Sequence, residues 1–207
     1  KETIKTFKSN IMGTVNVMEA VKIKNKKQII ILVTSDKVYQ NNELGISFKE
    51  NSSLGGKDPY SGSKSCQDIV AQAYNYSFFN KKTKNLGIAR IGNIIGGGDW
   101  SKNRLIPDIF RILSKSNILI RNQYAIRPWQ HVIETTYYIC QLAFQISRNK
   151  NLAGIYNFGP DKANQCSVKK VCKKIEERLK NNNIKKKFNY LKKNSLKEAN
   201  ILRLNNN

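Results

Sequence analysis

Tyr60 and Lys64 are the residues in this chain whose spacing points most directly to chemistry. They stand four positions apart, so on a helix they share one face, and Pro59 suits the first turn of such a helix. A tyrosine alone has a pKa of about 10 and is a poor base near neutral pH, but a nearby ammonium favours its phenolate form. The spacing therefore predicts a proton-transfer device, although it also fits a solvated helix face.

A second group of polar residues follows a short apolar run. Residues 28–34, QIIILVT, are typical of a strand buried on both faces of a parallel sheet, and Ser35, Asp36 and Lys37 come directly after it. Residues 86–95, LGIARIGNII, form a second such pattern, broken by a glycine next to Asn93. Ligands of open α/β sheets bind at the carboxyl ends of the strands, so we expect these side chains to gather there.

The remaining patterns predict helices and strands in alternation around these residues. Helices are expected over residues 1–21, 60–80, 105–114, 132–146 and 168–179, and further strands over residues 117–121 and 154–158. Residues 41–58 and 121–131 are expected to be loops, and residues 180–193 a charged link with little pattern. The succession predicts an α/β protein.

Composition excludes several other classes of protein. Of the 207 residues, 40% are hydrophobic and 9% aromatic, as in globular proteins with one core or two lobes. The formal charge of +23 favours contact with phosphates, but the lysines lie in separate clusters without interleaved aromatics, so we expect no specific nucleic-acid partner. No apolar run is long enough to span a bilayer. Four cysteines without CxxC spacing indicate reduced thiols and no metal site.

Several phrases of the sequence resemble a known family. In chain order they are NIMGTVNVMEAV, VTSDKVYQN, GGKDPYSGSK, IARIGNIIGGGDW, RLIPDI, IRNQYAIRPWQHV and YNFGP, and the tail KEANILRL resembles the family's ending pattern. The chain resembles the extended short-chain dehydrogenase/reductases and, within them, the nucleotide-sugar 4,6-dehydratases of the CDP-glucose type. The resemblance covers nearly the whole chain.

The resemblance implies a fold and a division into domains. It implies the C-terminal part of a Rossmann-type doubly wound parallel sheet, together with a small mixed α/β substrate-binding lobe. Residues 1–98 and 128–160 would form part of an NAD-binding domain, and residues 99–127 and 161–207 part of a nucleotide-sugar-binding domain. The family's glycine fingerprint, which binds the NAD pyrophosphate, is not in this sequence. We therefore expect a fragment truncated at both ends, with an uncovered sheet edge and no activity by itself.

The family's reaction implies roles for the residues at the strand ends. NAD would oxidise C4 of the hexose while Tyr60 takes the hydroxyl proton, with Lys64 lowering the pKa of Tyr60 and Ser35 hydrogen-bonding the C4 oxygen. Asp36 would protonate the departing C6 hydroxyl. Lys37 stands where dTDP-glucose dehydratases carry glutamate, and it would act in the C5/C6 elimination only with a lowered pKa; a plain surface lysine is the alternative. Hydride return to C6 would give a 4-keto-6-deoxy sugar for deoxysugar and lipopolysaccharide O-antigen biosynthesis.

Further residues gain a role from the resemblance alone. The cofactor contacts would be Thr34, Tyr60, Lys64 and Ile91, and the substrate contacts would be Asn93, Arg104, Leu105, Ile106, Arg121 and Arg127. Arg127 would bind the diphosphate, whereas Arg121 is equally compatible with an ordinary surface position. Asn10 would either help to shape the site or lie on a plain helix surface. His131 would either contact substrate or be a packed structural residue.

The resemblance also implies partners. The cofactor would be NAD, the substrate CDP-glucose or a related nucleotide sugar, and the full-length protein a cytoplasmic homodimer joined through the helices of Asn10 and Tyr60. Two alternatives stay open. One is a dehydratase or epimerase of the same family that acts on a dTDP-, GDP- or UDP-sugar, and a remote one is a basic nucleic-acid-binding module.

Overall fold

A computed structural model describes residues 2–24, 28–79, 85–113, 118–161, 164–191 and 200–205. The helices are α1 (Thr3–Phe7), α2 (Gly13–Lys24), α3 (Pro59–Tyr74), α4 (Leu105–Arg111), α5 (Val132–Arg148) and α6 (Val168–Asn181). The strands are β1 (Ile30–Ser35), β2 (Leu86–Ile91), β3 (Asn93–Ile95), β4 (Ile118–Ile120), β5 (Ile126–Arg127), β6 (Trp129–His131), β7 (Gly154–Phe158), β8 (Cys166–Ser167) and β9 (Phe188–Tyr190). Within the described ranges, no helix is long and apolar enough to cross a membrane.

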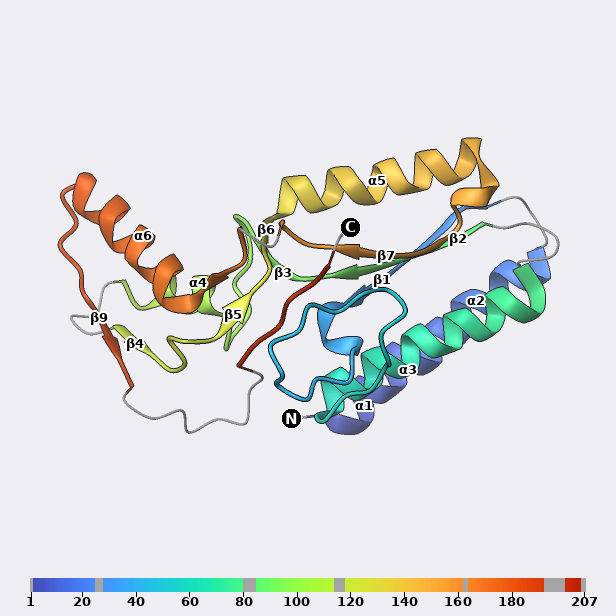
Figure 1. The fold of residues 1–207 in the computed structure, drawn as a ribbon, viewed down its shortest axis with the longest axis horizontal. Coiled ribbons are helices and arrows are strands. Elements are labelled where there is room, and N and C mark those ends of the chain that lie inside the picture. Colours follow the sequence, from blue (N-terminus) through green and yellow to red (C-terminus); the bar gives the residue numbers. More distant parts are fainter. Residues whose placement is uncertain are drawn as a thin grey trace.

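A parallel sheet of order β1-β2-β7 forms the centre of the larger part of the molecule. Helices α2 and α3 lie on one face of this sheet and α5 on the other (Figure 1). All six residues of β2 are buried, as an apolar strand between two strands and two helix layers must be. Outer strand β1 is less covered, and 39% of Val33 is exposed. The arrangement confirms the predicted α/β class.

A smaller lobe is built from short strands and two helices. Strands β4 and β9 pair in parallel, and β5 pairs with β8 antiparallel. Its core contains Ile109 of α4, Ile120 of β4, Cys172 of α6 and Phe188 of β9. The core of the larger part, in contrast, contains Met18 of α2 and residues of α3 and β2. The division into an NAD-binding and a sugar-binding domain remains a prediction.

Two local predictions differ from the structure. Residues 121–131, expected as a loop, contain β5 and β6, and the strand break at Gly92 lets β3 pair with β6. A Cβ on Gly92 would lie 2.6 Å from the carbonyl oxygen of Pro128, so only glycine permits this close approach. The link expected over residues 180–193 contains β9. The helical segments that precede and follow β1 in the sequence also include π-helical turns, at Lys8–Met12 and Asn75–Phe79.

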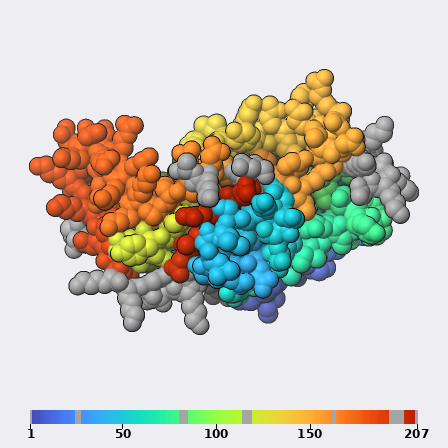
Figure 2. Space-filling model, viewed as in Figure 1, coloured from blue at the N-terminus to red at the C-terminus, as the bar shows by residue number. Residues whose placement is uncertain are grey.

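The C-terminal segment, residues 200–205, crosses the molecule as an irregular strap. Leu202 and Leu204 are buried with Val38, Tyr39 and Phe48, and Figure 2 shows the segment lying against the loop of residues 41–58. Phe48 also forms a parallel bridge with Leu204. The strap therefore packs against the segment that follows β1.

Candidate active site

One cleft of about 570 Å³ lies between the carboxyl ends of β1 and β2 and the smaller lobe. Every residue that the sequence predicts as catalytic, cofactor-binding or substrate-binding lines it: Thr34, Ser35, Asp36, Lys37, Tyr60, Lys64, Ile91, Asn93, Arg104, Leu105, Ile106, Arg121 and Arg127. Six lysine and arginine side chains but only two carboxylates, Asp36 and Asp99, are among the lining residues. The cleft is therefore suited to an anionic ligand.

The end of β1 turns sharply and brings three polar side chains to the cleft. The Ser35 hydroxyl accepts a hydrogen bond from the backbone N–H of Lys37 at 3.2 Å and donates to Oδ1 of Asp36 at 3.0 Å. Asp36 is 3% exposed, and its Oδ2 has no partner among the described residues. Burial raises the pKa of Asp36, and the Ser35 hydrogen bond and the charges of Lys37 and Arg127 only partly oppose this. Asp36 is thus protonated more readily than a solvated aspartate.

Helix α3 presents Tyr60 in its first turn. The helix begins where its sequence predicts, because the Asp58 carboxylate accepts hydrogen bonds from the backbone N–H groups of Tyr60 at 2.9 Å and Ser61 at 3.1 Å. Partial burial raises the pKa of Tyr60, while Ser35 and the charge of Arg104 are the groups that lower it. The Lys37 ammonium lies 5.8 Å from the centre of the Tyr60 ring.

Lys64 lies in the same cleft one helical turn beyond Tyr60, and in this structure its ammonium forms a hydrogen bond with Gln67. Its Nζ donates to Oε1 of Gln67 at 2.8 Å, and burial lowers the pKa of Lys64. The predicted lowering of the Tyr60 pKa by Lys64 is not among the main influences on Tyr60 here. That role therefore remains a prediction for the ligand-bound enzyme.

Removal of the Asp58 cap should weaken α3 where it carries Tyr60. We expect Asp58→Ala to lower the free energy of unfolding by about 1 kcal/mol, because two backbone N–H groups lose their acceptor. Asp58→Asn keeps an acceptor oxygen and should retain most of the stability. Urea denaturation of both variants measures the difference. Equal losses in the two variants would show that charge, and not capping, is what Asp58 contributes.

The substrate-side residues come from separate segments of the chain. Asn93 begins β3, and Arg104 precedes α4 and pairs with Asp99 at 3.4 Å. Arg121 lies 3.8 Å from Asp108 and is partly exposed. Arg127 is 7% exposed, and its Nη1 donates to the carbonyl oxygens of Ile126 and Asn200 at 2.9 and 3.3 Å.

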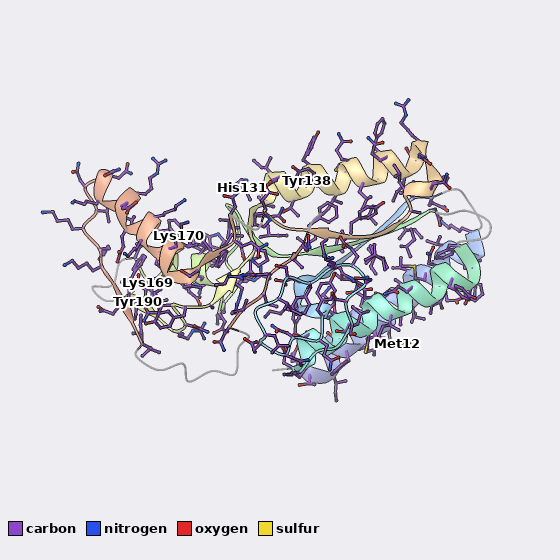
Figure 3. The ribbon with its side chains drawn as sticks, viewed as in Figure 1. Met12, His131, Tyr138, Lys169, Lys170 and Tyr190 are labelled. Carbon is purple, nitrogen blue, oxygen red and sulfur yellow. The ribbon has the colours of Figure 1, made fainter. Side chains whose placement is uncertain are left out.

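The sequence did not identify some of the lining residues, and it left the roles of Asn10 and His131 open. Asp99, Lys102 and Asn103 also line the cleft; the polar run after the glycine cluster was the available signal. The amide of Asn10 donates to the Ser63 hydroxyl at 2.8 Å and so joins the first π-helical turn to α3. His131 does not line the cleft; it is exposed at the start of α5 (Figure 3), where its Nδ1 accepts from the backbone N–H of Ile133. This differs from both roles considered for it.

A buried ion pair fixes α3 against the sheet below the cleft. Arg90 of β2 and Asp68 of α3 are 1% and 0% exposed and form two hydrogen bonds of 2.8 Å. Thr34 donates to the same carboxylate at 3.2 Å, and the Tyr39 hydroxyl accepts from Arg90 at 3.0 Å. The pair therefore connects the helix of Tyr60 to both strands that end at the cleft.

A family model described as GDP-mannose 4,6 dehydratase matches residues 1–203. The chain belongs to this family. It is 43% identical over 167 residues to the CDP-glucose 4,6-dehydratase of Salmonella typhimurium, covering 77% of this chain and 46% of that protein. It is 30% identical over 175 residues to the dTDP-D-glucose 4,6-dehydratase of Dictyostelium discoideum, covering 78% of this chain and 38% of that protein. The chain thus spans less than half the length of these two relatives.

The family's fold is also seen in solved structures. The dTDP-glucose 4,6-dehydratase of Bacillus anthracis, solved in complex with NAD, matches all of this chain with a TM-score of 0.79 at 23% identity. The chain covers 61% of that structure. At this identity the likeness establishes the fold, a Rossmann-type α/β arrangement, and confirms the predicted class. Together with the family match, it also confirms the resemblance to nucleotide-sugar dehydratases.

Proposed function

We propose that the complete protein is an NAD-dependent CDP-glucose 4,6-dehydratase that forms CDP-4-keto-6-deoxyglucose. The observation that carries this proposal is the meeting of Ser35, Asp36, Tyr60 and Lys64 with Arg127 in one basic cleft. The 43% identity to a protein named for this activity supports the choice of substrate.

The residues of the cleft are chemically suited to NAD. The Lys64 ammonium can donate to the ribose hydroxyls, and Thr34 and the apolar Ile91 lie at the adjoining strand ends. NAD supplies a hydride acceptor that is regenerated within the turnover. Tyr60 and Ser35 line the same cleft; Tyr60 would take the proton of the sugar C4 hydroxyl, and Ser35 would hydrogen-bond the C4 oxygen as charge develops on it.

The elimination of water is assigned to the residues after β1. Burial raises the pKa of Asp36, and its protonated form is the one that can protonate a departing C6 hydroxyl. Lys37 lies beside Asp36 and over the ring of Tyr60, within the same cleft. Only its neutral amine form can accept a proton, and in that form Lys37 would take the C5 proton, which the neighbouring C4 ketone has acidified.

The Lys37→Ala enzyme tests the elimination step. We expect its kcat to fall about a hundredfold, which is the lower part of the range for loss of a general base. Lys57→Ala is the matched control, because Lys57 is exposed and does not line the cleft. Steady-state assays of both enzymes measure the effect. A Lys37→Ala enzyme with unchanged turnover would remove Lys37 from the mechanism.

Arg127 and its neighbours bind the nucleotide diphosphate. A guanidinium matches two phosphate oxygens, and Arg104 and Arg121 add positive charge within the same cleft. Asn93 adds an amide, and Leu105 and Ile106 supply apolar surface beside the nucleotide. Each role follows from position in the cleft and from the family resemblance.

The decisive experiment is an assay of the complete protein with CDP-, dTDP-, GDP- and UDP-glucose. We expect a 4-keto-6-deoxy product, detected by its absorbance in alkali, from CDP-glucose in preference to the others. Preference for another nucleotide would favour a different dehydratase of the family. An epimerised product without the keto group would favour an epimerase, a reaction named for several proteins of this fold.

We also propose that the complete protein is a cytoplasmic homodimer. Large exposed apolar side chains gather on the paired helices before and after β1: Ile4, Met12, Val17, Ile23, Ile69 and Tyr76. Met12 lies on the outer side of this pair (Figure 3). A second copy would bury this surface. Sedimentation of the complete protein tests the assembly, and a monomer at micromolar concentration would contradict it.

A further inference from the structure

Gln67 is a buried polar residue of α3 to which the proposed reaction gives no role. It is 8% exposed and does not line the cleft. Its Oε1 accepts a hydrogen bond of 2.8 Å from Nζ of Lys64, three residues earlier on the same helix face. A half-buried ammonium needs such an acceptor, because burial without one favours loss of its proton.

The other charged and titratable groups near Lys64 do not accept a hydrogen bond from its ammonium in the described part of the chain. The titratable and charged residues that line the cleft with it are Tyr60 of α3, Asp36 and Lys37 after β1, Asp99, Lys102 and Arg104 before α4, and Arg121 and Arg127 of the smaller lobe. Within the described part of the chain, none of these carboxylates forms an ion pair with Lys64. Gln67 is therefore the partner that the structure gives to the ammonium.

We propose that Gln67 is a positioning residue for Lys64: its carbonyl oxygen holds the ammonium in the cleft that Tyr60 also lines and stabilises its charged form. A neutral acceptor is suited to this purpose. A carboxylate in its place would hold the ammonium as firmly but would cancel much of the positive field that Tyr60 is to experience. The catalytic part of this inference rests on the proposed function, whereas the contact between the two side chains does not.

Two opposite substitutions of Gln67 test the inference in the complete protein. Gln67→Leu removes the acceptor and should lower the pKa of Lys64, whereas Gln67→Glu adds a negative charge and should raise it. Competitive acylation at a series of pH values, read by mass spectrometry on the peptide that contains Lys64, measures the midpoint directly. We expect the acylation midpoint of Lys64 to lie below the wild-type value in Gln67→Leu and above it in Gln67→Glu.

Gln72→Leu is the matched control on the same helix. Gln72 donates to Asp68 at 2.7 Å and does not contact Lys64, so the midpoint of Lys64 should stay at the wild-type value. Unchanged midpoints in both Gln67 variants would overturn the inference. If the Gln67→Leu variant does not fold, the upward shift in Gln67→Glu decides alone.

Turnover supplies the second measurement. Gln67→Leu should lower kcat about tenfold, with its alkaline limit moved to lower pH, because one charge-assisted hydrogen bond is lost. KM for the nucleotide sugar should change little, since Gln67 does not line the cleft. Shifted midpoints in a protein without dehydratase activity would refute the proposed function and leave the positioning of Lys64 supported. Unshifted midpoints in an active enzyme would refute the positioning of Lys64 by Gln67 and leave the proposed function supported.

Discussion

Replacing Tyr60 by phenylalanine is expected to lower kcat of the complete protein about a thousandfold or more. In the proposed mechanism Tyr60 takes the C4 hydroxyl proton, and loss of a positioned acid–base group costs about 10²- to 10⁴-fold. The effect should lie in the upper part of this range, because the later steps depend on the C4 oxidation. The substitution removes one oxygen and leaves the ring over which the Lys37 ammonium lies. We therefore expect little change in the free energy of unfolding.

The pH dependence separates a catalytic loss from a structural one. Burial raises the pKa of Tyr60, so wild-type kcat/KM should rise with pH as the phenolate forms. The Tyr60→Phe enzyme should lack this rise. Tyr76→Phe is the control, because Tyr76 is 79% exposed and does not line the cleft. Near-wild-type turnover in Tyr60→Phe would contradict the proposed mechanism.

The long elements of the fold could be predicted because their patterns extend over many residues. The apolar runs predicted β1 and β2, and the periodic segments predicted α3, α5 and α6 to within a few residues. Short strands have no such signal. Strand β9 consists of three residues after a run of lysines, and it forms because Phe188 enters the core of the smaller lobe. Such strands are set by tertiary packing, which a local pattern does not contain.

The candidate site shows the same limit. Ser35, Asp36 and Lys37 could be placed at a strand end because parallel strands share a carboxyl edge. Partners such as Gln67 for Lys64 could not be found, since a polar residue on a helix is usually solvated. One signal was present but not used. Arg90 interrupts the apolar run of β2, and a buried guanidinium requires an anionic partner.

That partner gives the largest expected effect on stability. We expect Asp68→Asn to lower the free energy of unfolding of the complete protein by about 3–5 kcal/mol, because it leaves the buried charge of Arg90 without its counterion. The remaining contacts of Arg90, with the Tyr39 hydroxyl and the Glu50 carbonyl, are neutral and cannot replace a carboxylate. Urea denaturation measures the loss, and Asp161→Asn, at an exposed site, is the control.

The double variant Asp68→Leu/Arg90→Leu distinguishes the two ways in which the pair could act. If the cost comes from an unpaired buried charge, the double variant should be more stable than Asp68→Asn, because neither charge remains to be desolvated. Its α3 would then be held to β1 and β2 by apolar contacts alone, without the hydrogen bond that Thr34 donates to Asp68. A stable double variant with low kcat would therefore mean that the ion pair sets the position of α3 and, with it, of Tyr60. A double variant as unstable as the sum of its single changes would mean that charge desolvation is not the source of the cost.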